Sequence, residues 1–364
     1  MIVFAHLLND SSGSPRVLQS AITALADADR QQVLYIGSGG TGPLAGCGIP
    51  IRKYWYRRTR WRVLTLVTYV ASQALLLAQL LLARDIDRNA VVYVNTLLPF
   101  GAALFGWLTR RKVLYHVHEI SVTPAPLKWM LIGIARLTSS YNLYVSAAHQ
   151  AALPIFGVPY QRIYNALDPK FVEQAGSWVY EPHRNGVFRI LMLASLRDYK
   201  GVPELLALVE RLSNLDDVAF ELLVNDGAED IRRYFVSRDL PANLTVHPRV
   251  TDTAPFYQRA SLVLNLSRVD QWVETFGMTV LEAMAYGIPV IVPPVGGPTE
   301  LVQDNVQGYL VDSRDGELLA RTVVRLYENP VLCCALSNNC KLQSEKFSQE
   351  RFATALRKVL KVIY

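Results

Sequence analysis

The sequence is poor in cysteine. Its 364 residues include four, Cys47, Cys333, Cys334 and Cys340. Their spacing fits neither a metal site nor a dense disulfide framework, so we expect a reducing compartment. The opening residues MIVFAHLLND lack the length and the cationic start of a signal peptide, which favours their interpretation as a first strand. No low-complexity segment indicates disorder.

Acidic residues are fewer than basic ones. There are 31 Asp and Glu against 37 Lys and Arg, which gives a net charge of +6 and a pI near 9.1. This balance predicts an acidic partner: a nucleotide phosphate, an anionic lipid surface or a nucleic acid. About half of the residues (51%) are hydrophobic, which is enough for the two domains expected at this length.

The chain alternates apolar strands with helices. In the first half, helices separate strands expected at 2–8, 31–37, 90–95, 112–116 and 141–146. Such alternation predicts a parallel, doubly wound sheet. The polar segment 165–186 breaks the pattern and is the candidate linker. The alternation then resumes with a strand at 188–194 and continues to the last helix, which predicts a second sheet of the same kind.

A basic, aromatic segment precedes the longest apolar stretch. Residues 52–62, RKYWYRRTRWR, are followed by residues 63–83, which are long enough to span a bilayer. The stretch 63–83 contains Thr, Tyr, Ser and Gln and leads directly into a strand, so we interpret it as a buried or half-buried crossover helix. Segment 52–62 is either a solvated surface or a contact with anionic lipid headgroups, which attract Lys and Arg and accommodate Trp and Tyr.

Two histidines and a glutamate mark the end of the strand at 112–116. His116, His118 and Glu119 would suit a metal pair, but no third ligand cluster is nearby, so zinc is a minor alternative. Parallel sheets place ligand contacts at the carboxyl ends of their strands. We therefore predict that His118 contacts a ligand.

Two carboxylates stand out between Asn265 and Val311. Glu274 lies just before an apolar helix and Glu282 lies eight residues later, which would place both roughly on one face. The alternative is an exposed pair whose only role is to suit the helix dipole. The helix is otherwise apolar and should be buried, and a buried carboxylate needs a partner or a ligand. The turn after Glu274 also leaves N–H groups available for an anion or a hydroxyl group.

The loops after two other strands can bind phosphate. The loop SLRDYKG carries Arg197 and Lys200. Either cation alone could be surface charge, but both at the mouth of a strand, in the domain of the two glutamates, predict a diphosphate clamp. The small polar loop 9–15 lies between a strand and a helix, a geometry that presents backbone N–H groups to a phosphate or sugar.

The chain resembles the retaining glycosyltransferases of family 4 (glycosyl transferases group 1), which have the GT-B fold. The matching segments are ETFGMTVLEAMAYGIPVI with its E-x7-E pair, GGPTELV, QGYLV, LASLRDYKGVPELL, YNALDPKFV and, less closely, SSGSPRVL. The resemblance covers nearly the whole chain and implies an α/β fold of two Rossmann-like, doubly wound domains that face each other across a cleft. The implied parts are an acceptor-side domain at 1–165, a linker at 166–186, a nucleotide-sugar domain at 187–345 and a helix at 346–364 that packs back on the first domain.

The resemblance implies donor-binding roles in the second domain. Glu282 would hold the ribose hydroxyls of the donor, and Glu274 would contact hydroxyls of the transferred sugar. Arg197 and Lys200 would neutralise the diphosphate as the bond to the sugar breaks. Backbone N–H groups would add contacts beside Glu274, from Phe276, Gly277 and Met278.

Further roles are implied at both domains. Gly13 would let the backbone approach the phosphate without a side-chain clash. His118 would lie near C6 of the sugar, although the HVHE context leaves His116 as a rival. Val250 lies at a position where the main chain of family members often contacts the base of the nucleotide. Two departures from the family pattern concern acceptor geometry: SLRDYKG replaces the usual GRL-type turn, and the acceptor loop lacks the common double glycine.

The resemblance also implies a mechanism. The leaving diphosphate helps to accept the proton of the acceptor, and the enzyme stabilises charge on the phosphate and on the oxocarbenium-like sugar. The sequence has no DxD-like carboxylate pair in a suitable place, so we expect no metal and no other cofactor, with Arg197 and Lys200 in the electrophilic role.

These features predict a metal-independent, retaining glycosyltransferase that moves a sugar from a nucleotide sugar to a lipid-linked glycan in bacterial surface polysaccharide or lipopolysaccharide assembly. We expect it in the cytoplasm, peripheral at the inner face of the plasma membrane through 52–62. Nucleic acid is not expected as a partner because basic residues outside that segment are scattered. The alternative is a non-catalytic nucleotide-sugar-binding subunit of a glycosyltransferase complex, which would have no use for the buried charges. A phosphorylase would need a cofactor lysine site that the sequence does not show, and an epimerase would lack this charged set.

Overall fold

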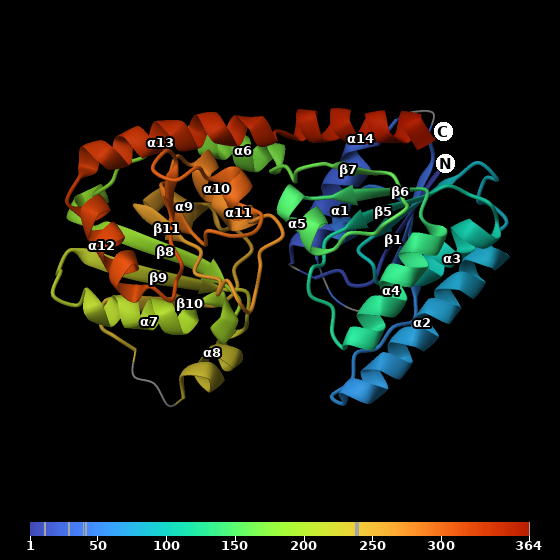
Figure 1. Ribbon diagram of the computed structural model, residues 1–364, viewed down its shortest axis with the longest axis horizontal. Helices are drawn as coiled ribbons and strands as arrows, with labels where there is room; N and C mark the ends of the chain where they lie inside the picture. The colour runs from blue at the N-terminus through green and yellow to red at the C-terminus, as the bar shows by residue number, and fades with distance from the viewer. Residues whose placement is uncertain (11, 28–29, 39, 41, 237–239, 364) are drawn as a thin grey trace. The chain divides into compact units, whose positions relative to one another are not determined.

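The computed structural model describes residues 1–10, 12–27, 30–38, 40, 42–236 and 240–363. The chain forms two compact units. Unit 1 comprises Met1–Ala166 and Gln349–Tyr364, and unit 2 comprises Leu167–Ser348. Each unit is built around one parallel sheet with helices on its faces (Figure 1).

Unit 1 contains a seven-stranded sheet in the order β3-β2-β1-β4-β5-β6-β7. Every neighbouring pair of strands is parallel. The central strands are runs of Val, Ile, Leu and Tyr that are buried on both faces, as a parallel sheet between helices requires. Their bounds are β1 (Ile2–His6), β2 (Gln32–Gly37), β3 (Ile51–Tyr54), β4 (Val91–Asn95), β5 (Val113–Val117), β6 (Tyr141–Tyr144) and β7 (Tyr160–Arg162).

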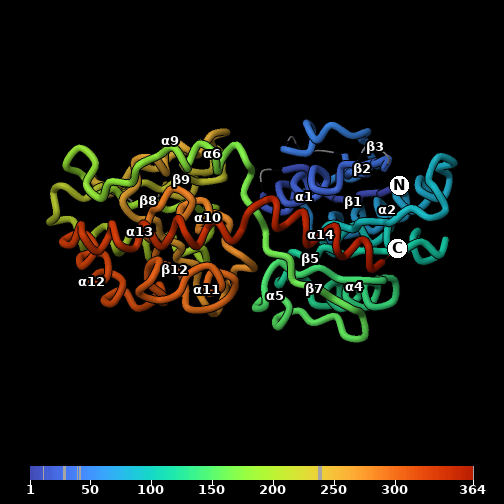
Figure 2. Tube along the Cα trace, turned by 90° about the horizontal axis from the view of Figure 1, so that it is seen from above, coloured from blue at the N-terminus to red at the C-terminus, as the bar shows by residue number. Residues whose placement is uncertain are grey.

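Helices cover both faces of this sheet. On one face α2, α3 and α4 contribute to a core that includes Val92 and Tyr115. On the other face α1 and α14 form a second core with Phe4 and Tyr93. Figure 2 shows α14 beside α1, although they come from opposite ends of the chain. The helices are α1 (Gly13–Ala24), η1 (Pro43–Gly46), α2 (Arg62–Leu82), α3 (Phe100–Leu108), α4 (Ala125–Thr138), α5 (Ala147–Ala152) and α14 (Gln349–Ile363).

The last helix completes unit 1. Phe352, Leu356 and Leu360 of α14 recur at helical spacing and are buried on the sheet side. Arg357 Nε donates a hydrogen bond to Ala24 O at 2.8 Å, which joins α14 to the end of α1. The helix expected at 346–364 therefore lies in unit 1, as α14.

Unit 2 contains a six-stranded parallel sheet in the order β10-β9-β8-β11-β12-β13. Its strands are β8 (Phe188–Ala194), β9 (Val218–Val224), β10 (Leu244–His247), β11 (Leu262–Leu264), β12 (Val290–Val292) and β13 (Gly308–Leu310). Its helices are α6 (Pro169–Gly176), η2 (Arg184–Gly186), η3 (Asp198–Lys200), α7 (Val202–Arg211), α8 (Ala228–Phe235), α9 (Ala254–Arg259), α10 (Met278–Ala285), α11 (Pro298–Leu301), α12 (Gly316–Tyr327), α13 (Pro330–Ser344) and η4 (Glu345–Phe347).

Two segments that the sequence left without regular structure contain some. The expected linker 166–186 contains α6, which packs against α9 and α10 within unit 2. The ring of Phe171 lies edge-on against Tyr257 and Tyr286, so an apolar contact orders a segment that looked polar. The start of the basic segment 52–62 belongs to the edge strand β3, which pairs with β2.

The strand order reverses once in each sheet. In unit 1 the reversal falls between β1 and β4, and in unit 2 between β8 and β11. At such a point the loops that leave the carboxyl ends of the two neighbouring strands run in opposite directions and leave room for a ligand. Each unit therefore has one edge position at which a site is expected.

Candidate functional site

Two of the predicted residues, Lys200 and Glu274, meet where the strand order of unit 2 reverses. Lys200 ends η3, which follows β8, and Glu274 lies in the loop after β11. Lys200 Nζ donates to Glu274 Oε1 at 2.6 Å. Ser267 Oγ donates to the same oxygen at 2.9 Å. The neighbouring strands thus bring together a cation and an acid that are far apart in the sequence.

Aromatic rings line this ion pair. Lys200 Nζ lies 4.4 Å from the centre of the Trp272 ring. That ring stacks on Tyr199, with 5.1 Å between centroids and 19° between planes. A cation over an aromatic face is attracted to the π electrons of the ring. Both Glu274 and Trp272 therefore hold the position of the ammonium group.

Glu274 is ionised in these surroundings. Burial alone would raise the pKa of its carboxyl, but the charge of Lys200 and the hydrogen bonds from Lys200 and Ser267 outweigh burial and hold the pKa below its ordinary value. An ionised carboxylate only accepts hydrogen bonds. Glu274 can therefore bind hydroxyl groups as well as the ammonium group of Lys200.

Two glycines allow the loops of this edge to approach each other. Gly201 has a φ of +86°, and a Cβ there would lie 2.2 Å from Leu266 O. A Cβ at Gly297 would lie 2.3 Å from Phe276 Cα, and the Gly297 N–H donates to Glu274 O at 2.8 Å. No other residue type permits these approaches. They fix the backbone that carries Glu274.

Arg197 and Lys200 do not act on one partner in this structure. Arg197 is exposed at the start of η3, and its Nη1 donates to Leu196 O at 2.9 Å. Lys200, on the same turn, is engaged by Glu274. The predicted clamp is therefore two cations on one turn, with one held by a carboxylate and the other on the surface.

Glu282 lies buried on α10. Tyr257 OH donates to its Oε2 at 2.7 Å, and the Tyr257 ring stacks on Tyr286 at 5.7 Å between centroids. Helix α10 begins at Met278, so Glu274 lies in the loop just before the helix, as the sequence predicts. Gly277, with a φ of +103°, separates the two, so helical spacing does not place Glu274 on one face with Glu282.

The other predicted donor contacts lie at the same edge. Phe276 is buried, with its ring centroid 5.8 Å from that of Phe347. Gly277 and Met278 form the start of α10, where helix N–H groups lack partners within the helix. Val250 is half-buried in the loop after β10, two strands away from β8. Val250 is therefore at the correct edge but separate from the ion pair.

In unit 1, Asn95 connects the predicted residues. Its Oδ1 lies 3.0 Å from His118 Nε2, and its Nδ2 donates to Ser14 O at 3.1 Å. His6 Nδ1 lies 3.1 Å from the same Nδ2. Ser14 follows Gly13, the first residue of α1, where a Cβ would meet no described atom within 4 Å other than its chain neighbours. Gly13 and His118 thus lie at one edge, where β1 and β4 meet.

The structure separates the two histidines that the sequence left as rivals. His116 is fully buried, its Nδ1 lies 2.6 Å from Tyr93 OH, and burial lowers its pKa to about 3. His118 is half-buried at the edge of the sheet. Burial, and then the nearby His116 and His149, lower the pKa of His118 well below its ordinary value. A neutral His118 is therefore the better placed of the two for a ligand.

Several polar residues at these edges were not singled out from the sequence. Asn95 is the polar last residue of the apolar strand VVYVN, a signal that could have identified it. Ser267 follows an apolar strand in the same way. Tyr257 and Trp272 carry no such signal, because aromatic residues of this kind are common in cores and become site residues only through packing.

Glu119, the residue after His118, accepts hydrogen bonds from the backbone. Leu97 N donates to both oxygens of Glu119, at 3.0 and 3.2 Å. Over the described ranges of the chain, no group of three or more His, Cys, Asp and Glu side chains is arranged to hold a metal ion. The minor zinc alternative at His116–Glu119 thus has no ligand set in that part of the protein.

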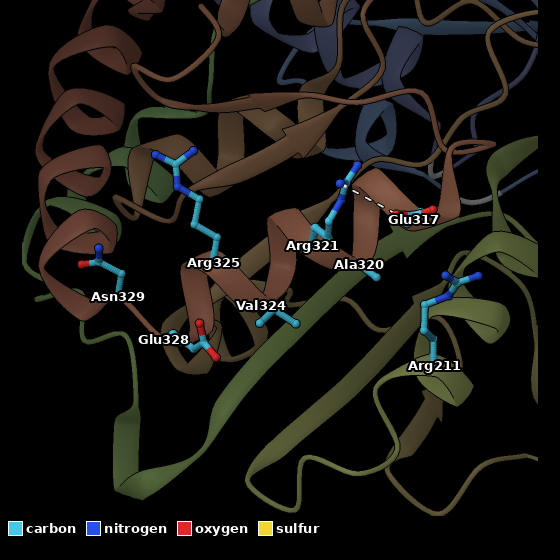
Figure 3. Close-up of a pocket in the computed structure, with 8 residues that line it drawn as sticks. All are labelled: Arg211, Glu317, Ala320, Arg321, Val324, Arg325, Glu328 and Asn329. Carbon is cyan, nitrogen blue, oxygen red and sulfur yellow. Dashed lines mark ion pairs between the residues drawn. The ribbon is translucent and has the colours of Figure 1, made fainter.

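A surface hollow of about 590 Å³ lies elsewhere in unit 2, between the end of α7 and α12 (Figure 3). The predicted site residues do not line it. Arg321 Nη1 lies 3.8 Å from Glu317 Oε1, so charges of both signs face this hollow. Its lining residues are Arg211, Glu317, Ala320, Arg321, Val324, Arg325, Glu328 and Asn329.

Unit 2 is similar to known glycosyltransferases. Residues 181–346 match the family model described as glycosyl transferases group 1. The D-inositol 3-phosphate glycosyltransferase of Salinispora arenicola is 36% identical over 112 residues, 31% of this chain and 24% of that protein. An uncharacterized glycosyltransferase of Methanocaldococcus jannaschii is 28% identical over 201 residues, 54% of this chain and 52% of that protein. The matches thus span about a quarter and about half of these relatives.

A solved structure matches the whole chain. The crystal structure of HepE from Anabaena in complex with UDP has a TM-score of 0.77 and 19% sequence identity, with 100% of both chains covered. At this identity the likeness concerns the fold. The prediction of a GT-B fold with two Rossmann-like domains is confirmed.

Proposed function

We propose that the protein moves a sugar from a nucleotide-diphosphate sugar to a glycan acceptor, with retention of configuration, because residues 181–346 match the glycosyl transferases group 1 family. The observation that carries the proposal is the pair of Lys200 and Glu274 at 2.6 Å, where the strand order of unit 2 reverses. A cation and an ionised acid at this point suit a ligand that combines phosphate with hydroxyl groups.

The ion pair has a role before and after donor binding. Without a donor, the charge of Lys200 lowers the pKa of Glu274 and helps to keep that carboxyl ionised. An arriving diphosphate would compete for the ammonium group of Lys200, and the exposed Arg197 would add a second cation. Glu274 could then accept hydrogen bonds from the sugar. Positive charge beside the departing phosphate lowers the barrier because negative charge grows there in the transition state.

Glu282 would bind the ribose. A carboxylate offers two oxygens and about four acceptor positions, so the hydrogen bond from Tyr257 orients Glu282 without exhausting its capacity. The start of α10 at Gly277 and Met278, with Phe276 before it, would supply N–H groups to the donor, and Val250 would lie near the base. In unit 1, the neutral His118 would contact the transferred sugar.

A panel of sugar nucleotides tests this function. A donor at 100 times its Kd should raise Tm by about 5 to 10 °C, because a ligand that binds only the folded state stabilises it. UDP sugars come first, since the Anabaena HepE crystal contains UDP. E282A should abolish the shift, and E317A on α12, outside the site, should retain it. If no sugar nucleotide stabilises the wild type, the proposed function is wrong; if E282A still responds, the ribose assignment is wrong.

We propose that no metal is required. Arg197 and Lys200 supply the positive charge that a divalent ion would otherwise place on the diphosphate. The rate of nucleoside diphosphate release, with donor and acceptor present, should be unchanged in excess EDTA. A strict requirement for Mn²⁺ or Mg²⁺ after chelation would contradict this part of the proposal. The anomeric configuration of the product, read by NMR, tests retention separately.

Gly13 should matter to the ligand and not to the fold. A Cβ at position 13 meets no other described atom within 4 Å, so G13A should leave Tm unchanged. If the diphosphate approaches this backbone, G13A should lower kcat/KM about tenfold or more, the cost of one misplaced contact in a site of this kind. G46A is the matched control, because Gly46 also has open space around its Cβ. Equal activity of G13A and wild type would remove Gly13 from the site.

We further propose a lipid-linked glycan acceptor in bacterial surface polysaccharide assembly, with the enzyme peripheral at the cytoplasmic face of the plasma membrane. The exposed basic residues of segment 52–62 support this choice. The acceptor is tested by comparing nucleoside diphosphate release with lipid-linked and with soluble glycan. A preference for the soluble form would overturn the acceptor class and leave the donor chemistry intact.

A further inference from the structure

Helix α2 exposes large apolar side chains on its outward side. No charged residue occurs between Arg62 and Arg84. The outward side carries an apolar strip at helical spacing, with Val63 77%, Val67 57% and Leu82 79% exposed. A surface helix of a soluble protein normally presents polar residues to solvent and apolar residues to the core. This strip is therefore an exposed hydrophobic surface, which is unfavourable in water.

The inward side of α2, which combines buried Leu76 and Leu80 with polar Gln73, fixes the helix to unit 1. Tyr69 OH donates to Leu98 O at 2.7 Å. The Gly101 N–H donates to Gln73 Oε1 at 3.2 Å, and a Cβ at Gly101 would lie 2.3 Å from Gln73 O. Helices α2 and α3 are therefore packed with their backbones in near contact. A bilayer-spanning position for α2 would break these contacts and place Gln73 in hydrocarbon, which is costly.

Neighbouring helices extend the apolar strip. Helix α3 lies between α2 and α4 on the same face of the sheet (Figure 1). Their outward residues include several large apolar side chains, and Trp129 on α4 is 68% exposed. Other exposed members are Trp107, Leu108, Met130 and Leu137. Exposed large apolar side chains thus occur on three neighbouring helices of one layer, as they do at interaction sites.

Cations gather at the amino end of α2. Arg57, Arg58, Arg60 and Arg62 are all exposed, and in the described parts of the chain no carboxylate lies within ion-pair distance of them. Trp61, 74% exposed, lies among them. Arg52, by contrast, is paired with Asp85 and donates to Tyr35 OH, so it belongs to the fold. The charge at this end is complementary to an anionic surface.

We propose that the outward face of α2, with those of α3 and α4, docks on an anionic lipid bilayer, and that α2 lies in the plane of the interface. An apolar strip with arginines and tryptophans at its border suits the boundary between headgroups and acyl chains. A second copy of this chain would bring the same four arginines to the contact and is disfavoured by their repulsion. Docking does not depend on sugar transfer, because none of the proposed donor-binding residues lies on these helices.

Vesicle flotation tests the proposal with the full-length protein. Wild type should float with vesicles of phosphatidylcholine and phosphatidylglycerol at 7:3. Its binding to vesicles of pure phosphatidylcholine should be weaker by about tenfold or more, since each basic residue near an anionic surface adds attraction. V67E/V70E and R57S/R58S/R60S should each lose most of the binding. V331E/L342E changes two apolar positions on α13 of unit 2 that are at least as exposed as Val67 and Val70; it is the matched control and should bind like wild type.

Separate measurements distinguish the competing outcomes. Sodium carbonate at high pH should release the bound protein; a fraction that resists extraction would indicate a spanning helix and overturn the in-plane position. Light scattering should give a monomer; a dimer that V67E/V70E dissociates would assign the face to self-association instead. Thermal melts should show that the variants are folded. Equal flotation of wild type and V67E/V70E would also overturn the proposal, whatever the result of the sugar-nucleotide panel.

Discussion

Replacing Lys200 by methionine should lower kcat/KM for sugar transfer by about a hundredfold to a thousandfold, the loss seen when one preorganised charge stabiliser is removed from a transition state. Methionine keeps a chain of similar length over Trp272, so the packing of the loop changes little. What disappears is the positive charge that now lies 2.6 Å from Glu274 Oε1. If the reaction passes through a charged diphosphate leaving group, that charge cannot be replaced by packing.

The same substitution has a stability cost that must be separated from the catalytic one. K200M leaves Glu274 without its cation, and breaking a largely buried pair costs about 3 kcal/mol or somewhat less where water can enter. K200M/E274Q removes both charges and should recover much of the stability but none of the activity. Tm and kcat/KM measured for both variants will distinguish the two effects.

A matched control is available in the same unit. Arg259 pairs with the buried Glu221 at 2.8 Å in the middle of the sheet, away from the carboxyl edge. R259M should therefore destabilise unit 2, although less than K200M because Arg189 Nη1 still lies 3.3 Å from Glu221 Oε1. It should leave kcat/KM within about twofold of wild type, because distant sites act independently. If K200M and R259M reduce activity equally, Lys200 acts through stability and the proposed role in charge stabilisation is wrong.

Acid should unfold unit 1 well before carboxylates in general are protonated. Burial lowers the pKa of His6 and His149 to about 4 and that of His116 to about 3, and it lowers the pKa of His118 as well. These groups are neutral in the folded protein and would bind protons in the unfolded chain near pH 6.5. Stability is therefore full above pH 6.5 and falls as pH drops towards 4, by about 1.4 kcal/mol per pH unit for each histidine.

One carboxyl in this cluster acts in the opposite direction. Burial raises the pKa of Glu119, although hydrogen bonds from the backbone of His118 and Leu97 partly offset it. As pH falls, Glu119 therefore binds a proton in the folded state before it does so in the unfolded state. This stabilises the folded state and cancels the loss of stability caused by up to one histidine. The net loss is about 4 kcal/mol per pH unit once the unfolded histidines are charged. A domain stabilised by 5 to 15 kcal/mol, the usual order of magnitude, would unfold between about pH 5 and 4.

Urea unfolding at pH 7, 6 and 5 measures this dependence, with hydrogen exchange used to follow unit 1. His149 Nε2 lies 2.9 Å from Glu119 O, and the amide of H149Q can donate to the same oxygen. H149Q should therefore reduce the pH slope by about one proton without a large loss at pH 7. If the free energy of unfolding stays constant between pH 7 and 5, for wild type and variant alike, these histidines are not buried as neutral groups.

The sequence by itself determined the architecture. Apolar runs such as 2–6 and 188–194 alternate with helical segments, and this local periodicity leaves a parallel, helix-covered sheet as the stable arrangement for each half. It also predicted which loops carry the polar residues, because carboxyl ends of parallel strands lie at one edge. Lys200 was predicted on that basis, and Glu274 from its place just before a buried, apolar helix. Gly277, in the left-handed region, separates Glu274 from the start of α10 at Met278, so helical spacing alone does not relate Glu274 to Glu282.

Only the tertiary structure decided which side chains are partners and which faces are left uncovered. The pairing of Lys200 with Glu274 depends on β8 lying next to β11, and the burial of His116 depends on α14 returning from the end of the chain to cover β5. The exposed apolar side of α2 also follows from packing, since the composition of this helix fits a core helix equally well. These properties arise from contacts between distant segments, and a linear pattern of hydrophobicity does not specify which distant segment will be the neighbour.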